Sequence, residues 1–243
     1  MLKRLETLLL GGCKELEELP REVKQLVNLR MLVLTSKQKQ LLDNGIGCLT
    51  SLRCLVIGSC CNLEKLFNDT DNLKSLRTLI IGNCPNLASL PQGVKNLSSL
   101  EKLMFFNSKK TSELESLLYQ NNQHLRSLVP HLRMLCIDGF PNFQQLPPWL
   151  RDPDNVLDRL AIKNCPDFNE LPMEPQKIFK SLQHLEISNC PKLSSLPKDM
   201  HLTALRELKV RNCPTLTKIC KQGQVKIPRI ELDGKVIDLK QLQ

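Results

Sequence analysis

The chain has 243 residues, of which 41% are hydrophobic and 4% aromatic, and it carries a formal net charge of +9. No apolar run reaches the roughly 18 residues of a membrane span, and no leading apolar segment suggests a secretory signal. Cysteines number eleven. An odd number without a signal favours free thiols in a reducing compartment, and therefore a cytoplasmic protein.

One template recurs along the sequence, and its two most similar copies are Leu76–Pro91 and Leu182–Pro197. They read LRTLIIGNCPNLASLP and LQHLEISNCPKLSSLP. The general form is L-x-x-L-x-(L/I/V)-x-x-C-x-x-L-x-x-L-P, and successive copies start 23 to 25 residues apart except for one interval of 32. The copies start at Leu5, Leu29, Leu52, Leu76, Leu100, Leu132, Leu157, Leu182 and Leu205.

The spacing within each copy predicts its local structure. The x-L-x-L segment has a period of two, which indicates a short strand with two apolar side chains facing inward. A turn follows at the Cys or Asn place, and the final Pro lacks an N–H and ends regular pairing. Because one copy buries too little apolar surface to fold alone, the copies must stack. The pattern and period match leucine-rich repeats. We therefore predict an α/β-repeat fold: a curved leucine-rich-repeat solenoid (horseshoe) with a parallel sheet on the concave face and mostly irregular or 3-10 turns on the convex face.

Two segments interrupt or end the repeats. Residues 108–130 form an irregular insertion with about eight extra residues, read either as a tolerated convex-face insertion with a short helix or as a partner-contacting element. Asp233-Gly234 between β-prone runs predicts a hairpin. The predicted organisation is thus a solenoid of about nine repeats over 1–220 and a capping hairpin and tail over 221–243.

Two further expectations concern the first copies. Lys37 stands where the second copy should have its cysteine, so an irregular turn is expected there. No corresponding cap precedes the first copy, and Leu2 and Leu5 would lie at an open end of the solenoid. This arrangement suggests a portion of a larger protein, or a chain that needs a neighbour to cover its first copy.

Three segments carry a resemblance to a known family: Ile81–Leu103, Ile187–Leu208 and Ile227–Lys235. They resemble the C-terminal repeats of plant nucleotide-binding leucine-rich-repeat disease-resistance proteins, and the form N-C-P-x-L-x-x-L-P is typical of the coiled-coil branch. The resemblance implies an effector-sensing and autoinhibitory module of an innate immune receptor. Its implied partners are a pathogen effector or guarded host protein, and the nucleotide-binding domain of the same or a longer receptor. The sequence contains no G-x-x-x-x-G-K-(S/T) phosphate loop, so it gives no basis for nucleotide binding.

Recognition is expected on the outward face of the strands. The central outward position is apolar from Leu9 to Cys136, and the face becomes charged after Arg159. A contiguous exposed apolar strip usually marks an interface, although strand propensity alone would also favour Val and Ile there. The predicted partner-binding residues are Met31, Val33, Val56, Ile80, Met104, Phe106, Met134, Arg159, Lys163, His184, Glu186, Lys209 and Arg211.

Other candidate chemistry is weaker. The cysteines at the turn place are read as small half-buried side chains that pair weakly with the backbone. Disulfides or a metal are the alternative, because stacked neighbours would lie about 5 Å apart. The histidines lack ligand spacing and no nucleophile has a companion motif, so no catalytic residue, cofactor or metal is predicted. Without interleaved aromatics, the basic C-terminal end is read as a solvated or partner-facing surface rather than a nucleic-acid site.

The sequence therefore predicts a non-enzymatic protein-recognition module of a plant immune receptor. A stand-alone intracellular scaffold that joins signalling proteins is the first alternative. An enzyme or nucleotide switch is the second, and the missing phosphate loop argues against it.

Overall fold

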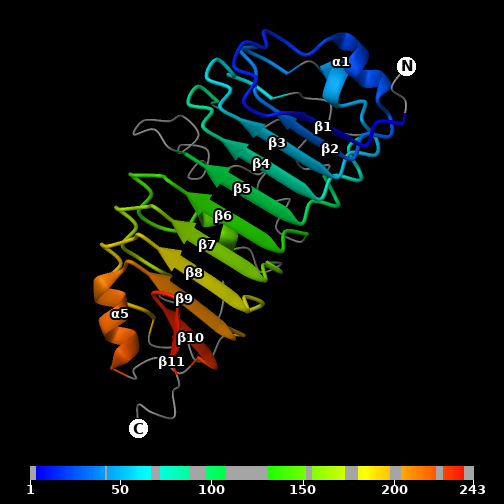
Figure 1. The fold of residues 1–243 in the computed structure, drawn as a ribbon. Coiled ribbons are helices and arrows are strands. Elements are labelled where there is room, and N and C mark those ends of the chain that lie inside the picture. The colour runs from blue at the N-terminus through cyan, green and yellow to red at the C-terminus, as the bar shows by residue number, and fades with distance from the viewer. Residues whose placement is uncertain are drawn as a thin grey trace. The chain divides into compact units, whose positions relative to one another are not determined.

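The computed structural model forms two compact units, Met1–His131 (unit 1) and Leu132–Gln243 (unit 2), drawn as a ribbon in Figure 1. The structure describes residues 4–41, 43–66, 72–87, 97–107, 131–151, 155–172, 180–197, 204–222 and 227–237.

The described part of unit 1 contains a ladder of parallel strands, each formed by an x-L-x-L segment. The pairing aligns equivalent residues of successive copies, so that Leu55 is opposite Leu79 and Leu79 is opposite Leu103. These inward leucines are at most 2% exposed, as the predicted register requires. The strands are β1 (Thr7–Leu10), β2 (Met31–Leu34), β3 (Cys54–Gly58), β4 (Thr78–Gly82) and β5 (Lys102–Phe106).

Unit 2 repeats this ladder and ends it with a hairpin. Its parallel strands are β6 (Met134–Asp138), β7 (Arg159–Lys163), β8 (His184–Ser188), β9 (Glu207–Arg211) and β10 (Arg229–Leu232), and β11 (Lys235–Ile237) pairs antiparallel with β10. The turn between β10 and β11 places Asp233 and Gly234 at φ 48° and 84°, so the hairpin prediction is confirmed.

The chain leaves most strands through one recurring turn. The residue before the cysteine place has a positive φ, between 49° and 57° at Ser59, Asn83, Asn164, Asn189 and Asn212. Asn adopts this left-handed conformation more readily than most residues. The cysteine carbonyl then accepts a hydrogen bond from the N–H three residues later, as in the Leu87 N–H to Cys84 bond of 3.2 Å.

The helices are mostly short, as predicted. They include 3-10 helices at Arg21–Gln25 and Pro148–Arg151 and a single α-helical turn, α1, at Asp43–Ile46. An eight-residue α-helix, α5 (Pro214–Lys221), is an exception among the mostly irregular or 3-10 turns that the sequence predicts. The last copy has no L-P ending, and its buried Leu216 and Cys220 lie four residues apart on one helical face. The short helix predicted within 108–130 lies outside the described residues.

The cysteines of the turn form no disulfide bonds with one another, and all except Cys13 serve as small core residues. Cys60, Cys84, Cys165, Cys190 and Cys213 are at most 1% exposed. Their thiols donate to carbonyls two residues earlier, for example Cys165 Sγ to Lys163 O at 3.1 Å and Cys190 Sγ to Ser188 O at 3.3 Å. This geometry agrees with the packing interpretation of these residues. Cys13, in the first copy, is exposed.

The second copy corrects one sequence assignment. The backbone N–H of Ser36 donates to Cys60 Sγ at 3.4 Å, just as the N–H of Cys190 donates to Cys213 Sγ at 3.4 Å. Ser36, and not Lys37, therefore occupies the cysteine place, because this turn is one residue shorter than the template. Ser36 is 3% exposed, and its hydroxyl has no hydrogen-bond partner among the described residues.

Candidate functional site

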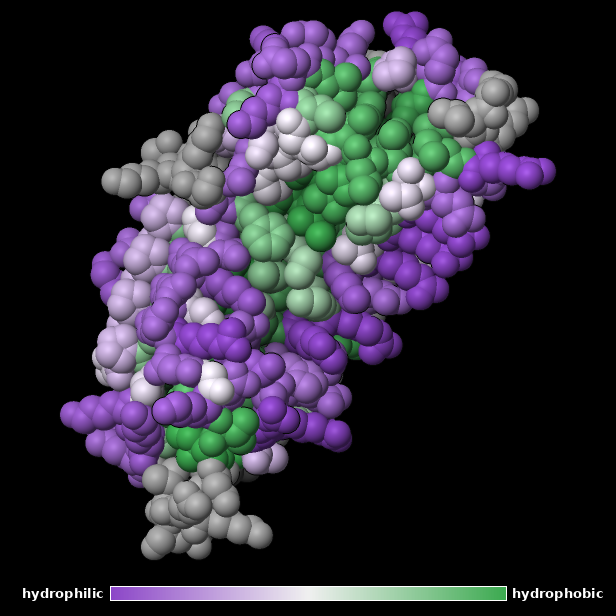
Figure 2. Space-filling model, in the orientation of Figure 1, coloured by the Kyte–Doolittle hydropathy of each residue, from purple (hydrophilic) through white to green (hydrophobic). Residues whose placement is uncertain are grey.

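The outward face of β1–β5 in unit 1 carries a continuous row of apolar side chains, which we call the apolar strip: Leu9, Val33, Val56, Ile80 and Met104. They lie opposite one another because the strands pair in register. Leu9 is 64% exposed and the other four are half-buried. Figure 2 shows this strip as a hydrophobic surface over the strands of unit 1.

Neighbouring positions widen the strip. Met31 and Cys54 lie two residues before Val33 and Val56, at the preceding outward position of β2 and β3, and they are half-buried and also apolar. On the other side, Gly82 is the register partner of Phe106. A Cβ added to Gly82 would lie 3.2 Å from Phe106 Cβ, so the glycine leaves room for this phenylalanine at the end of β5. The six predicted contact residues of unit 1 thus lie together on one face.

The corresponding face of unit 2 begins apolar but is less exposed than predicted. Cys136 and Ala161 are 3% and 7% exposed, although the alternation of the strands turns both outward. Ala161 lies opposite Glu186 on β8, and Glu186 Oε1 is 2.9 Å from Lys163 Nζ. Burial raises the pKa of the Cys136 thiol to about 11. These small side chains lie low among longer charged neighbours, and only Met134 of this apolar group is half-exposed.

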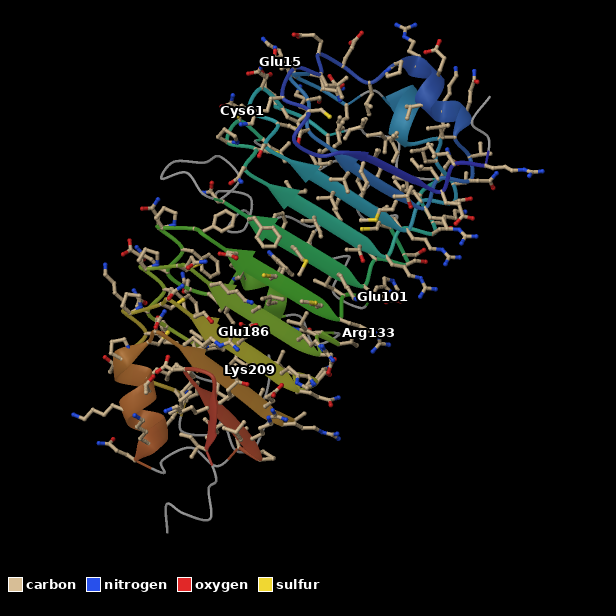
Figure 3. The ribbon with its side chains drawn as sticks, viewed as in Figure 1. Glu15, Cys61, Glu101, Arg133, Glu186 and Lys209 are labelled. Atoms are coloured by element: carbon tan, nitrogen blue, oxygen red, sulfur yellow. The ribbon has the colours of Figure 1, made fainter. Side chains whose placement is uncertain are left out.

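The charged residues of unit 2 pair with one another. Glu207 is the centre: its carboxylate oxygens lie 3.1 Å from His184 Nδ1, 3.7 Å from Lys209 Nζ and 3.1 Å from Arg229 Nε. Arg211 donates to Glu231 Oε1 at 2.8 Å. In Figure 3 the labelled Glu186 and Lys209 lie on neighbouring strands of this face. We call these residues, together with Lys163, the ion-pair lattice.

The lattice changes how its carboxylate titrates. Burial raises the pKa of Glu207, but the hydrogen bond with His184 and the charges of Lys209 and Arg229 outweigh burial and hold this pKa below its usual value. Every predicted charged contact residue of unit 2 has an ion-pair partner within the chain, including Arg159, whose Nε is 3.5 Å from Asp158 Oδ2. Their charges are therefore partly neutralised before any partner arrives.

Sequence reasoning missed Arg229, Glu231 and the central role of Glu207. The signal was present, since R-I-E-L at β10 repeats the x-L-x-L pattern and pairs in parallel with β9. Reading this segment only as one half of a hairpin left its outward side chains out of the surface.

A family model of the leucine-rich repeat region matches residues 1–163. The chain belongs to the leucine-rich-repeat family. The leucine-rich repeat domain of the type III effector XopL matches it with a TM-score of 0.62 and 21% identity, covering 93% of this chain and 76% of that one. At this identity the match shows the fold alone, and it confirms the predicted parallel-sheet solenoid.

Two further solved structures match with lower TM-scores. A leucine-rich repeat protein of Leptospira interrogans has a TM-score of 0.47 at 23% identity and covers 93% of this chain and 67% of its own. The internalin inlF from Listeria monocytogenes has a TM-score of 0.41 at 17% identity, with coverages of 99% and 84%. Curated proteins gave no significant match.

The leucine-rich-repeat chain also has a pocket of about 500 Å³ in unit 1, beyond the ends of β2–β4. Its lining includes Thr35, Ser59, Asn83 and Lys37. Lys37 is held by two carboxylates, with Nζ 2.8 Å from Glu15 and 3.1 Å from Glu17. Those contacts compensate its charge.

A polar ladder connects the turns of unit 2. The Asn212 side-chain amide donates to Asn189 Oδ1 at 2.8 Å, Asn189 donates to Asn164 Oδ1 at 2.6 Å, and Asn164 donates to Asp138 Oδ1 at 2.6 Å. At the other end, Asp233 Oδ1 accepts a hydrogen bond of 2.9 Å from the Asn212 N–H. The side-chain amides of the ladder form hydrogen bonds with one another, which indicates that these residues have a structural role.

The residues that the structure describes contain no group of three or more His, Cys, Asp or Glu side chains placed to hold a metal ion. In the same ranges, no helix has the length and apolar character needed to cross a membrane.

Proposed function

We propose that this leucine-rich-repeat chain is a protein-recognition module that binds its partner on the apolar strip of unit 1. The observation that carries the proposal is the exposure of the strip. Five successive strands present an apolar side chain outward at the same place, and Leu9 is 64% exposed. Strand propensity favours Val and Ile at such positions, but it does not require Leu9, Met104 and Met31 beside them. A contiguous apolar surface of this kind usually marks an interface.

The ion-pair lattice of unit 2 has a secondary part in this proposal. Arg159, Lys163, His184, Glu186, Lys209 and Arg211 remain proposed contact residues. Because each already has an intramolecular partner, exchanging one ion pair for another yields little binding energy. We therefore assign these residues to orientation and specificity, and the apolar strip to affinity.

The test compares two surface variants of the full chain. Ile80→Asp combined with Met104→Asp places two carboxylates in the middle of the strip. Lys218→Asp is the matched control, because Lys218 is exposed on α5 and belongs neither to the strip nor to the ion-pair lattice. Proteins retained by the immobilised wild-type chain from a plant-cell extract should be retained by Lys218→Asp and lost with the double variant. Equal retention by the double variant, with an unchanged circular dichroism spectrum and melting curve, would remove the strip as the binding surface.

We further propose that the module senses a pathogen effector or a guarded host protein, and holds the nucleotide-binding domain of a cytoplasmic plant immune receptor inactive. Support comes from the N-C-P-x-L-x-x-L-P segments at Asn83–Pro91 and Asn189–Pro197, which resemble that family. The transcript tests this placement. A nucleotide-binding module encoded upstream in the same reading frame supports it, and a transcript that encodes this chain alone favours the scaffold function instead. Fluorescence microscopy of the tagged protein in plant cells tests the location.

A further inference from the structure

A row of charged side chains runs along unit 1 beside the apolar strip. Its members occupy the same template place, immediately before each strand, and their backbones are joined by hydrogen bonds. The Arg53 N–H donates to Arg30 O at 2.8 Å, and the Arg77 N–H donates to Arg53 O at 2.9 Å. The row consists of Glu6, Arg30, Arg53, Arg77 and Glu101.

The two ends of this row are internally paired and its centre is not. Arg30 NH1 lies 3.4 Å from Glu6 Oε2, and Arg77 NH1 lies 3.6 Å from Glu101 Oε1. Arg53 is exposed and has no carboxylate partner among the residues that the structure describes. Its neighbours on both adjacent strands are arginines, about 5 Å away along the ladder. Like charges on adjacent strands repel, so this arrangement favours an added anion at Arg53.

The position of Arg53 relates that anion to the strip. Arg53 immediately precedes β3, and Val56 of the strip follows three residues later, about 10 Å along an extended chain. A partner lying on Val56 therefore brings its neighbouring residues within reach of the Arg53 guanidinium. Guanidinium groups bind carboxylates through two parallel hydrogen bonds, and such a bond at the edge of an apolar contact fixes the orientation of the bound segment.

Resting on the proposed function, we infer that the partner of unit 1 presents a segment in which an acidic side chain lies beside apolar side chains. Its apolar residues pack on the strip, and its carboxylate binds Arg53 between Arg30 and Arg77. A nucleic acid fits this surface poorly. The carboxylates Glu6 and Glu101 end the basic row on both sides, and Phe106 is the one aromatic side chain in the strip and its described flanks on which a base could stack.

The test uses a displayed library of random twelve-residue peptides selected on the full 243-residue chain. Selected peptides should be enriched in Asp or Glu together with Leu, Ile, Val or Phe. One such peptide, labelled and followed by fluorescence anisotropy, should bind Arg53→Glu about tenfold more weakly or worse than wild type, and its affinity for wild type should fall as salt is added. Arg206→Glu is the matched control, because Arg206 precedes β9 at the same template place in unit 2. The affinity of the Arg206→Glu variant for the peptide should stay within about twofold of the wild-type value.

Each other outcome is informative. A selection that yields no peptide, peptides without acidic enrichment, or unchanged binding to a folded Arg53→Glu variant overturns the inference. Loss of binding in Ile80→Asp, with no loss in Arg53→Glu, leaves the proposed surface standing and removes only its acidic partner. Binding that survives both substitutions removes the surface itself. Equal weakening by Arg53→Glu and Arg206→Glu shows a general charge effect, which also overturns the inference.

Discussion

Replacing Ser36 with alanine should stabilise the protein. The side chain is 3% exposed and its hydroxyl has no partner among the described residues. A buried hydroxyl without a hydrogen bond costs about 1–3 kcal/mol. Removing one oxygen also forfeits a few dispersion contacts, each of about 0.1–0.2 kcal/mol. The balance predicts a gain of about 1–2 kcal/mol in the free energy of unfolding.

The assay is urea unfolding of the full chain under reducing conditions, followed by far-ultraviolet circular dichroism. With a urea dependence of about 2–3 kcal/mol per molar, the gain corresponds to a midpoint higher by about 0.5 M. The control is Cys190→Ser, which places a hydroxyl in the corresponding site of unit 2. There the native thiol donates to Ser188 O at 3.3 Å and to Ile162 O at 3.8 Å. This variant should be less stable than wild type. A Ser36→Ala protein that unfolds at lower urea than wild type would show that the hydroxyl is paired, and would refute the reasoning.

Three further predictions concern unit 2, and urea unfolding checks each of them. Glu207→Gln should lower the free energy of unfolding by about 1 kcal/mol at pH 7. Because the pKa of Glu207 is lower in the folded protein than in the unfolded chain, this difference should shrink as the pH falls below about 4.3. A difference that is independent of pH would contradict the role of Glu207 in the ion-pair lattice. Asn189→Ala should lower the free energy of unfolding by about 1–2 kcal/mol. It removes two hydrogen bonds of the polar ladder, and alanine adopts the left-handed conformation at φ 55° less readily than asparagine does. Asn189→Gly, which keeps this conformation accessible, should cost less, and the reverse order would count against the backbone argument. Gly234→Ala, at φ 84°, should cost about 1 kcal/mol, whereas an unchanged midpoint would show that the turn relaxes freely.

Strand positions, register and the inward faces were predictable because they depend on local period alone. Leu55, Leu79 and Leu103 align since each copy repeats the same spacing, and Asp233-Gly234 specifies its turn through backbone preference. The composition of the outward face could be read in the same way, because alternation fixes which residues point out. The structure turns the apolar strip and the charged positions of unit 2 outward, as this alternation requires, and their role in binding stays a prediction.

The remaining features depend on side chains meeting across strands. Ala161 is buried because Glu186 is its register partner and pairs with Lys163, a relation that no single copy contains. Ser36 fills the cysteine place because one turn is shorter than the template. The helix α5 forms where the L-P ending is missing. Aligning the last copy with the template predicted a turn there, so the helix was not predicted. A reading that compares each outward residue with its equivalents in the adjacent copies would recover the ion pairs, but not the burial they produce.

The buried cysteines make local unfolding of this protein measurable by thiol modification. The hydrogen bond with Cys60 and burial both raise the pKa of Cys84, and burial raises that of Cys220 to about 11. Such thiols react with alkylating reagents only when the surrounding copy opens. Since the cysteines are distributed along successive copies, their individual modification rates, read by mass spectrometry, would map local unfolding copy by copy. The exposed Cys13 and Cys61 would supply the reference rate for an accessible thiol.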